Sequence, residues 1–313
     1  MKVFTHNFNP SSNSGPNKFT RDLFRRLVKE KNISLVSQSD SDIEFCLIQQ
    51  QQSKVKPLVL RLDGIWFNSE QDYRSQNTPI RFAYNNADAV IFQSDFNKKL
   101  TESWFGPHKN GIVIHNAADD EIFSNSDVIS FSNGIKWPWG KDREIWSCAS
   151  SWRPHKRLRE NVRYFLEFSP ENAIFAIAGN VQDEQELKEC LNLSDRIHYL
   201  GELTYQGLVC LYLKSSTFVH LAYLDHCPNV VVDAQAAGCR IICSSTGGTS
   251  EIVDTGSMVI EKEWDFKPCK LYSPPPLDFS NLKSIDQIYN NTSKFENCTE
   301  KYYNSFKKVL EWD

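Results

Sequence analysis

Two aspartates eight positions apart, on either side of an expected helix start, form the pattern in this chain best suited to binding chemistry. Asp225 lies three residues before Pro228, and Asp233 lies inside the helix that residues 228–237 predict. Because Asn229 and Asp233 are four residues apart, they share a face of this helix. A carboxylate repels phosphate but accepts hydrogen bonds from two vicinal hydroxyls, so Asp233 suits a sugar. The alternative is a solvated aspartate on an ordinary crossover helix.

The start of the same helix is expected to bind an anion. Pro228 suits the first helical position, and Gly238 ends the helix because glycine readily adopts the left-handed conformation. The N–H groups of Asn229, Val230 and Val231 then lack intrahelical acceptors, and the helix dipole adds partial positive charge there. Such a helix end most often binds phosphate. Together with the two aspartates, it indicates a ligand that carries both phosphate and sugar.

Basic side chains follow another expected strand, residues 144–150. Arg153 and Lys156 fall at the strand-to-helix turn, where arginine would give a forked contact to a diphosphate and lysine a point charge. Cations are disfavoured at a helix amino terminus. The four lysines and arginines within residues 153–159 therefore imply an anion that offsets this cost. A basic helix start without a ligand is the alternative.

The strings DHCPNVVVDAQAAG and TGGTSEIV, within residues 217–253, resemble the donor-site signature of the family-four retaining glycosyltransferases, also called glycosyl transferases group 1. That family carries two glutamates separated by seven residues, and this chain keeps the spacing with aspartates. It also has Gly238-Cys239-Arg240 where the family usually has Gly, any residue and Pro. The resemblance implies the GT-B fold, in which two Rossmann-like domains face each other across a cleft.

The resemblance also implies roles for these residues. Asp225 would contact hydroxyls of the transferred sugar, and Asp233 would hold the ribose of the nucleotide. Arg153 and Lys156 match the setting of the family's donor-phosphate Arg and Lys, although the usual spacing is longer and Arg157 replaces a common glycine. The other donor-binding residues that we expect are Pro228, Asn229, Val230, Gly15, Glu202, Leu203 and Gly248. Among these, Glu202 and Leu203 would approach the nucleobase, and Gly248 would offer a turn amide.

The amino-terminal half contributes two further candidates. Gly15, with Ser14 and Asn17, lies in a loop between a strand at residues 2–5 and an amphipathic helix at residues 18–31, and a surface turn is the alternative. Asp63 follows a strand at residues 58–62, where ligands of α/β sheets gather. Asp63 would orient an acceptor hydroxyl or the donor sugar, or it would cap the next segment. Asp40 of the Asp40-Ser41-Asp42 turn is not expected to bind metal, because a hard cation needs several convergent oxygens.

The pattern of short apolar strands and amphipathic helices predicts an α/β protein. Residues 1–140 would form an acceptor-side Rossmann-like domain, and residues 141–313 a nucleotide-sugar-binding one. Further strands are expected at residues 33–36, 43–48, 173–180, 197–203, 217–221 and 240–243, and Ser94 or Asp95 would cap a helix within residues 88–106. Residues 124–142 would connect the domains, and residues 274–280 would form a stiff linker. The last helix, residues 297–312, would cross back to the first domain.

The amino-acid composition limits which binding partners and which cellular compartment are expected. The chain has 313 residues, enough for two domains, and its formal net charge of -4 gives no reason to expect nucleic acid. Nine cysteines without a CxxC pair suggest free thiols in a reducing compartment. No apolar run approaches the roughly 20 residues of a membrane span. We therefore expect a cytoplasmic protein. The basic amphipathic helix at residues 18–31 is expected to cover a sheet, and the alternative is that it contacts a membrane surface.

These features predict a retaining, metal-independent glycosyltransferase without a cofactor. It would move a hexose from a UDP- or GDP-linked donor to a hydroxyl of a glycan or lipid-linked acceptor, with the departing phosphate taking the proton. One alternative is a non-catalytic nucleotide-sugar-binding protein, suggested by the substituted acidic pair. The other is a sugar-nucleotide epimerase of the same fold, which would need several acid/base groups, and only Asp63 and His6 offer themselves.

Overall fold

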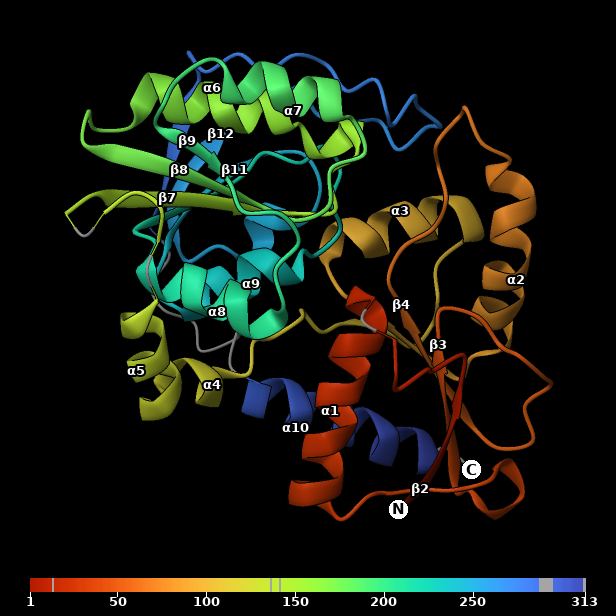
Figure 1. Cartoon of the computed structure of the whole chain (residues 1–313). Coiled ribbons are helices and arrows are strands. Elements are labelled where there is room, and N and C mark those ends of the chain that lie inside the picture. The colour runs from red at the N-terminus through yellow and green to blue at the C-terminus, as the bar shows by residue number, and fades with distance from the viewer. Residues whose placement is uncertain (13, 136, 141, 287–294, 312–313) are drawn as a thin grey trace. The chain divides into compact units, whose positions relative to one another are not determined.

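The computed structural model describes residues 1–12, 14–135, 137–140, 142–286 and 295–311, and it contains two compact units (Figure 1). Unit 1 comprises Met1–Ala117, Asp265–Cys269 and Asn291–Asp313, and unit 2 comprises Ala118–Trp264 and Lys270–Asn290. Each unit has its own sheet, and helices connect most of the strands. The α/β fold class is therefore confirmed.

Unit 1 is built on a sheet in which every strand pair is parallel. Its strands, in the spatial order β2-β1-β3-β4-β5-β6, are β1 (Lys2–His6), β2 (Ser34–Leu35), β3 (Ile43–Leu47), β4 (Leu58–Leu62), β5 (Ala89–Phe92) and β6 (Gly111–Val113). The helices of unit 1 are α1 (Gly15–Lys31), the short 3-10 helix η1 (Gln38–Asp40), α2 (Tyr73–Asn86), α3 (Asp95–Phe105) and α10 (Phe295–Leu310). Every residue of β3 and β4 is buried, as a parallel sheet covered on both faces requires.

Helices α1 and α10 pack side by side over this sheet (Figure 1). The expected apolar face of α1 is buried, and the Phe19 ring lies 5.8 Å from Phe295 and 6.0 Å from Tyr302. Arg26 of the same helix is also buried and lies over the Phe295 ring at 5.2 Å. The last helix thus belongs to unit 1, as expected; its expected final residue, Trp312, lies outside the described residues.

Unit 2 has a seven-stranded sheet that is parallel except at one edge, where β13 runs antiparallel to β12. Its strands, in the order β13-β12-β11-β10-β7-β8-β9, are β7 (Glu144–Ala149), β8 (Ala173–Ala178), β9 (Ile197–Tyr199), β10 (Thr217–His220), β11 (Arg240–Ser244), β12 (Thr255–Val259) and β13 (Leu282–Asp286). Its helices are α4 (Asp120–Ser124), α5 (Ser126–Gly134), α6 (Leu158–Phe168), α7 (Glu184–Leu191), α8 (Tyr205–Lys214), α9 (Asn229–Ala236) and the 3-10 helices η2 (Pro154–Lys156) and η3 (Thr249–Ile252).

Two apolar layers hold the helices to this sheet. Figure 1 shows α6 and α7 on one face and α8 and α9 on the other. On the first face, the Phe165 and Phe175 rings stack at 4.9 Å, and on the second the Tyr212 and Phe218 rings meet at 5.4 Å. The sheet is therefore covered on both sides, and its loops carry the polar side chains at the strand ends.

The structure differs from the sequence expectation in several segments. The contacts divide the chain after Ala117 rather than at residue 140, because α5 packs on α8 of unit 2 and Ser132 donates to the Cys210 carbonyl at 3.4 Å. Residues 124–142 therefore contain a packed helix, not only a connection. The expected linker at residues 274–280 is also packed, since Phe279 lies against Tyr164 at 5.3 Å. Helix α2, with Pro79 inside it, was not expected.

A buried ion pair fixes the turn between β7 and α6. Arg157 adopts a left-handed conformation, with φ 55°, at the position where the resembled family commonly has glycine. Its guanidinium gives two hydrogen bonds to the Glu261 carboxylate, at 3.0 and 2.7 Å, and the two side chains are 1% and 8% exposed. It also donates to the Pro275 carbonyl at 2.8 Å. The turn is thereby joined to the segment that follows β12.

Removing either partner of this pair should destabilise unit 2 strongly. We expect Arg157→Met and Glu261→Met each to lower the free energy of unfolding by about 3–5 kcal/mol, because the remaining charge stays buried without a partner. The double variant should lose less than the sum of the two. Denaturant unfolding followed by circular dichroism measures these values. The exposed pair Arg159–Glu189 supplies the control Arg159→Met, which should change stability far less; equal losses in the two arginine variants would contradict the argument.

Candidate donor site

The candidate site residues of unit 2 gather beyond the carboxyl ends of three neighbouring strands. Arg153 and Lys156 follow β7, Asp225 follows β10, and Gly247 follows β11. In parallel α/β sheets this edge is where ligands bind. The structure brings Lys156 and Asp225, 69 positions apart in the chain, into a direct ion pair. Arg153 is exposed at the start of η2.

The Asp225 carboxylate is the centre of this cluster. Its Oδ2 contacts Lys156 Nζ and lies 3.0 Å from His220 Nε2, and its Oδ1 accepts from the His226 N–H at 2.9 Å. Because an ionised carboxylate only accepts hydrogen bonds, His220 must carry its proton on Nε2 and donate it. The carboxylate has about four acceptor positions, so one remains for a ligand hydroxyl.

Burial and charge together set the ionisation of this cluster. Burial acts to raise the pKa of Asp225, but the Lys156 ammonium and the His220 hydrogen bond outweigh it and hold that pKa well below its usual range. Burial lowers the pKa of His220, while the Asp225 hydrogen bond opposes the shift. At neutral pH the site therefore holds the Asp225 carboxylate beside a neutral His220 imidazole.

Helix α9 starts beside this carboxylate, one residue later than expected. Pro228 is the residue before the helix, and its carbonyl accepts the Val231 N–H at 3.1 Å. The expectation that the Val231 amide is free for an anion is therefore wrong. Asn229 and Val230, both half-buried, occupy the first turn. Asp233 shares a helix face with Asn229 and is 7% exposed, with its charge near the buried Tyr212 ring.

The basic residues at the β7–α6 turn are mostly paired within the protein. Lys156 pairs with Asp225, Arg157 with Glu261 and Arg159 with Glu189. The inference that four basic residues require an external anion is therefore wrong for three of them, since carboxylates from distant parts of unit 2 already offset the charge. Arg153 makes no ion pair within the described parts of the chain, so its charge faces solvent.

The Gly247-Gly248 turn packs against Asp225 instead of presenting both its amides. Gly248 N–H donates to the Asp225 carbonyl at 2.7 Å, and this amide is not available to a donor, contrary to expectation. Gly247 has φ 88°, and a Cβ there would lie 2.4 Å from the same carbonyl oxygen. The turn therefore needs glycine at residue 247 so that its backbone can seat the Asp225 loop.

The expected nucleobase contacts lie in the loop that follows β9. This strand ends at Tyr199, earlier than the expected residue 203, so Glu202 and Leu203 precede α8. Glu202 is exposed and Leu203 is half-buried. Both residues remain predictions as base contacts.

In unit 1, a buried polar network fixes Asp63 at the carboxyl end of β4. Arg61 is 1% exposed and pairs with the Asp63 Oδ1, while it also donates to Asn116 Oδ1 at 2.9 Å. Asn116 in turn donates to Gln93 Oε1 at 3.1 Å. The carboxylate therefore pairs with an arginine and caps no helix. Within the described ranges of the chain, its Oδ2 has no hydrogen bond and is open to a hydroxyl donor.

The other candidate residues of the amino-terminal half make contacts within the protein. Gly15 begins α1, three residues before the expected start, and Ser14 accepts from Asn17 Nδ2 at 2.9 Å. His6 is fully buried, with Nε2 2.7 Å from Glu44 Oε2. In the Asp40-Ser41-Asp42 turn, Asp42 accepts from the Lys2 N–H at 2.7 Å. Over the residues that the structure describes, no cluster of His, Cys, Asp and Glu could hold a metal ion.

Sequence reasoning missed two histidines that border the candidate site. His220 ends β10, and His155 lies in η2 with its ring stacked on Tyr272 at 5.4 Å. The signal for His220 was available, because it occupies the carboxyl end of an expected parallel strand. His155 gave no such signal, since its surroundings come from distant segments.

Three comparisons relate the chain to known proteins. Residues 135–269 match the family model described as Glycosyl transferases group 1. The O-antigen chain mannosyltransferase RfbU of Salmonella typhimurium is 21% identical over 178 residues, which are 54% of this chain and 46% of that protein. The match therefore spans less than half of that relative.

Solved structures share the fold over nearly the whole chain. Sucrose-phosphate synthase from Thermosynechococcus elongatus gives a TM-score of 0.73 at 12% identity and covers 100% of both chains. Anabaena HepE, solved in complex with UDP and glucose, gives 0.68 at 14% identity and covers 98% of this chain and 100% of HepE. At such identities, similarity establishes fold alone.

The two Rossmann-like units and the similar solved structures define the fold. The segment that matches the glycosyl transferases group 1 model lies mostly in unit 2, and the chain has the GT-B fold. The fold class expected from the DHCPNVVVDAQAAG and TGGTSEIV strings is thereby confirmed, and the match over residues 135–269 agrees with the family resemblance. Among the helices of the described residues, none is both long and apolar enough to cross a membrane.

The buried His155 should make the stability of the protein depend on pH. Burial, with the Lys156 charge, lowers its pKa from 6.5 to about 3. At pH values between the folded and the unfolded pKa of His155, the imidazole is protonated in the unfolded chain but not in the folded one. The free energy of unfolding therefore falls as pH falls, by about 1.4 kcal/mol per pH unit. In His155→Gln this contribution is absent. We expect the Tm of this variant to decline less steeply than wild type between pH 6.5 and 4.5; parallel curves would contradict the assignment.

Proposed function

We propose that this protein transfers a hexose from a nucleotide-diphosphate sugar to an acceptor hydroxyl, with retention at the anomeric carbon and without a metal or cofactor. The observation that carries the proposal is the Lys156–Asp225–His220 cluster at the carboxyl edge of the unit 2 sheet, beside the start of α9 and inside the matched segment. HepE is named with UDP and glucose, and RfbU as a mannosyltransferase, which supports a hexosyl donor.

The leaving diphosphate would lie between the β7–α6 turn and the start of α9. Arg153 supplies a charge that no carboxylate of the described protein offsets, and Lys156 supplies a second one that Asp225 shares. The amides of the first turn of α9 add partial positive charge at Asn229 and Val230. Stabilisation of charge that develops on a leaving group is usually the largest contribution to catalysis.

The two aspartates would bind the hydroxyls of the donor. Asp225 is held rigidly by His220 and Lys156, and its remaining acceptor position suits one hydroxyl of the transferred sugar. In this arrangement His220 is a positioning residue, because it acts through Asp225. Asp233 would accept from the ribose, on the same face of α9 as Asn229.

The reaction balances without a covalent intermediate. The bond between the anomeric carbon and the phosphate oxygen breaks, and a bond from the acceptor oxygen to that carbon forms on the same side. The hydroxyl proton passes to the departing phosphate oxygen. In unit 1, the Asp63 Oδ2 would accept a hydrogen bond from a hydroxyl of the acceptor or of the transferred sugar.

The residues available for epimerase chemistry do not favour that alternative. His6 is fully buried against Glu44, and Asp63 is paired with Arg61. A group that exchanges protons with substrate must reach it within about 2.6–3.2 Å. The fully buried His6 ring has no such access. The remaining alternative, a nucleotide-sugar binder without turnover, differs from the proposal only in activity.

Removing the Lys156 charge should slow the chemical step. We expect Lys156→Met to lower kcat by about 10²–10³-fold, because its ammonium stabilises the leaving diphosphate. His220→Gln should lower kcat less, since it loosens Asp225 without removing a charge.

The assay incubates UDP-glucose and GDP-mannose with a panel of sugar acceptors and measures nucleotide release. Arg159→Met, which removes a paired arginine from the exposed face of α6, is the matched control. Nucleotide-sugar binding without release by the whole panel, or a Lys156→Met variant as active as wild type, would refute the proposal.

The product should carry the same anomeric configuration as the donor. Proton NMR of the purified product distinguishes the two anomers of the new glycosidic bond. The same reaction run with excess EDTA should proceed at an unchanged rate. An inverted product would contradict retention, and a loss of activity in EDTA that Mg²⁺ or Mn²⁺ restores would contradict metal independence.

A further inference from the structure

A cavity of about 510 Å³ opens at the opposite edge of the unit 2 sheet from the candidate donor site. It lies at the amino-terminal ends of the strands, where Glu144, Thr217 and Arg240 are the first residues of β7, β10 and β11. A strand of five or six residues is roughly 17–20 Å long, so the two sites are separated by the depth of the sheet. The volume falls within the range of about 300–1,000 Å³ that is typical of small-molecule sites.

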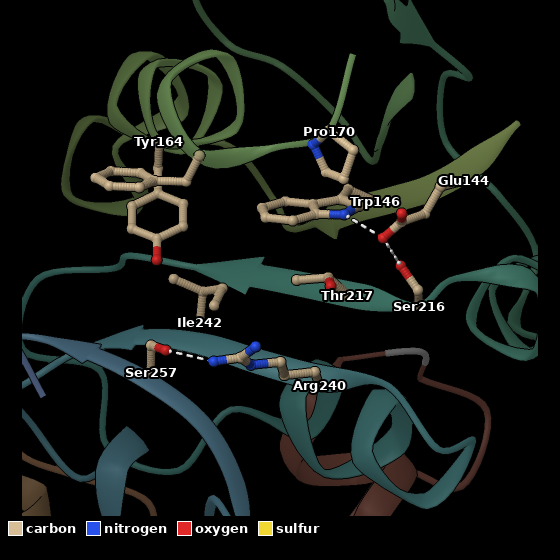
Figure 2. Close-up of a pocket in the computed structure, with 10 residues that line it drawn as sticks. Glu144, Trp146, Tyr164, Pro170, Ser216, Thr217, Arg240, Ile242 and Ser257 are labelled. Carbon is tan, nitrogen blue, oxygen red and sulfur yellow. Dashed lines mark hydrogen bonds between the residues drawn. The ribbon is translucent and has the colours of Figure 1, made fainter. Parts of the chain in front are cut away.

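Aromatic side chains form the upper wall of this cavity. Trp146 and Tyr164 are buried, and Phe168 at the end of α6 is 37% exposed and marks the rim. Figure 2 shows the Trp146 and Tyr164 rings on one side of the cavity, with Ile242 and Arg240 opposite. The cavity exists because α6 ends at Phe168 and leaves the beginnings of these strands uncovered.

The Tyr164 hydroxyl is a polar group that points into the cavity. The residue is only 3% exposed, and Figure 2 shows its hydroxyl directed from α6 toward Ile242. Throughout the described ranges of the chain, this hydroxyl has no hydrogen-bond partner. The Arg240 charge acts on it electrostatically. Because this hydroxyl can both donate and accept a hydrogen bond, it is available to a ligand group in the cavity.

Polar groups on the lower wall and at the side are held in place. Glu144 Oε1 accepts from Trp146 Nε1 at 2.9 Å and from Ser216 Oγ at 2.8 Å (Figure 2). Its Oε2 receives no hydrogen bond within the described residues and can accept one. Arg240 donates to Ser257 Oγ at 2.9 Å and keeps further N–H groups for another acceptor. The Glu144 carboxylate, the Arg240 guanidinium and the Tyr164 hydroxyl thus offer hydrogen bonds beside the aromatic wall of the cavity.

We propose that this cavity binds a pyranose ring of a glycan, at a site separate from that of the nucleotide sugar. One face of such a ring presents C–H groups, which pack against the electron-rich faces of aromatic side chains. Its hydroxyls are donors and acceptors, and they match Glu144 Oε2, the Arg240 guanidinium and the Tyr164 hydroxyl. Phosphate suits the cavity poorly, because Glu144 lies beside the binding groups and repels an anion. The proposal concerns binding and does not depend on transferase activity.

The test measures binding of methyl α-D-glucopyranoside and methyl α-D-mannopyranoside to the full chain by saturation-transfer-difference NMR. We expect saturable binding of at least one glycoside, weakened about three- to tenfold in Tyr164→Phe and in Arg240→Met, since each variant removes one hydrogen-bonding group. Ser216→Trp, at an exposed rim position, should abolish binding by filling the cavity. Arg159→Met serves as the control and should bind like wild type.

A competition arm separates this site from the donor site. UDP should leave glycoside binding in place, because the nucleotide is expected at the other edge of the sheet. Complete displacement by UDP, no saturable binding of either glycoside, or equal affinities in wild type and all three cavity variants would each overturn the proposal. Loss of transferase activity has no bearing on these outcomes, so the two proposals fail independently.

Discussion

The charge of Asp225, whose side chain is only 15% exposed, is the constraint on which the candidate donor site depends. A carboxylate removed from water is costly unless other groups replace its hydration. Here Lys156, His220 and the His226 amide do so, while the Gly247-Gly248 turn seats the backbone of the same loop. Loops that follow three separate strands are thereby fixed around one charged group. The geometry of the site and the stability of this edge of unit 2 thus have a common origin.

The parts of the fold that follow from local pattern were predictable. Strand β4 has the expected bounds, β10 and β11 differ from expectation by one residue, and Ser94 caps α3 by accepting from the Asn97 N–H. Helix α2 was not predictable in this way, because it contains Pro79 and its buried face includes Asn77, which bonds the backbone of Trp66. A polar residue that is buried to hold a loop cannot be distinguished by sequence from one that faces water.

The candidate site was predictable in its residues but only partly in its electrostatics. The sequence placed Lys156 and Asp225 each after an expected strand, and the structure shows that these strands are adjacent and that the two side chains meet. It did not reveal the other carboxylates, because Glu261 lies 104 positions from its partner Arg157. Local reasoning at a helix start counts the charges of one segment. The partners that neutralise them come from strands adjacent only in the folded sheet, so the need for an external anion was overestimated.

The packing of α10 on α1 has a consequence for biosynthesis. Phe295, Tyr302, Phe306 and Val309 complete the apolar core of unit 1, yet they follow all of unit 2 in the chain. Domains generally fold in order of synthesis, amino-terminal first. Here the amino-terminal unit keeps an apolar surface uncovered until α10 has emerged from the ribosome, by which time unit 2 has already been synthesised. Unit 1 is therefore translated first but completed last. A chaperone would bind the nascent chain in the interval between synthesis of the amino-terminal part of unit 1 and the emergence of α10.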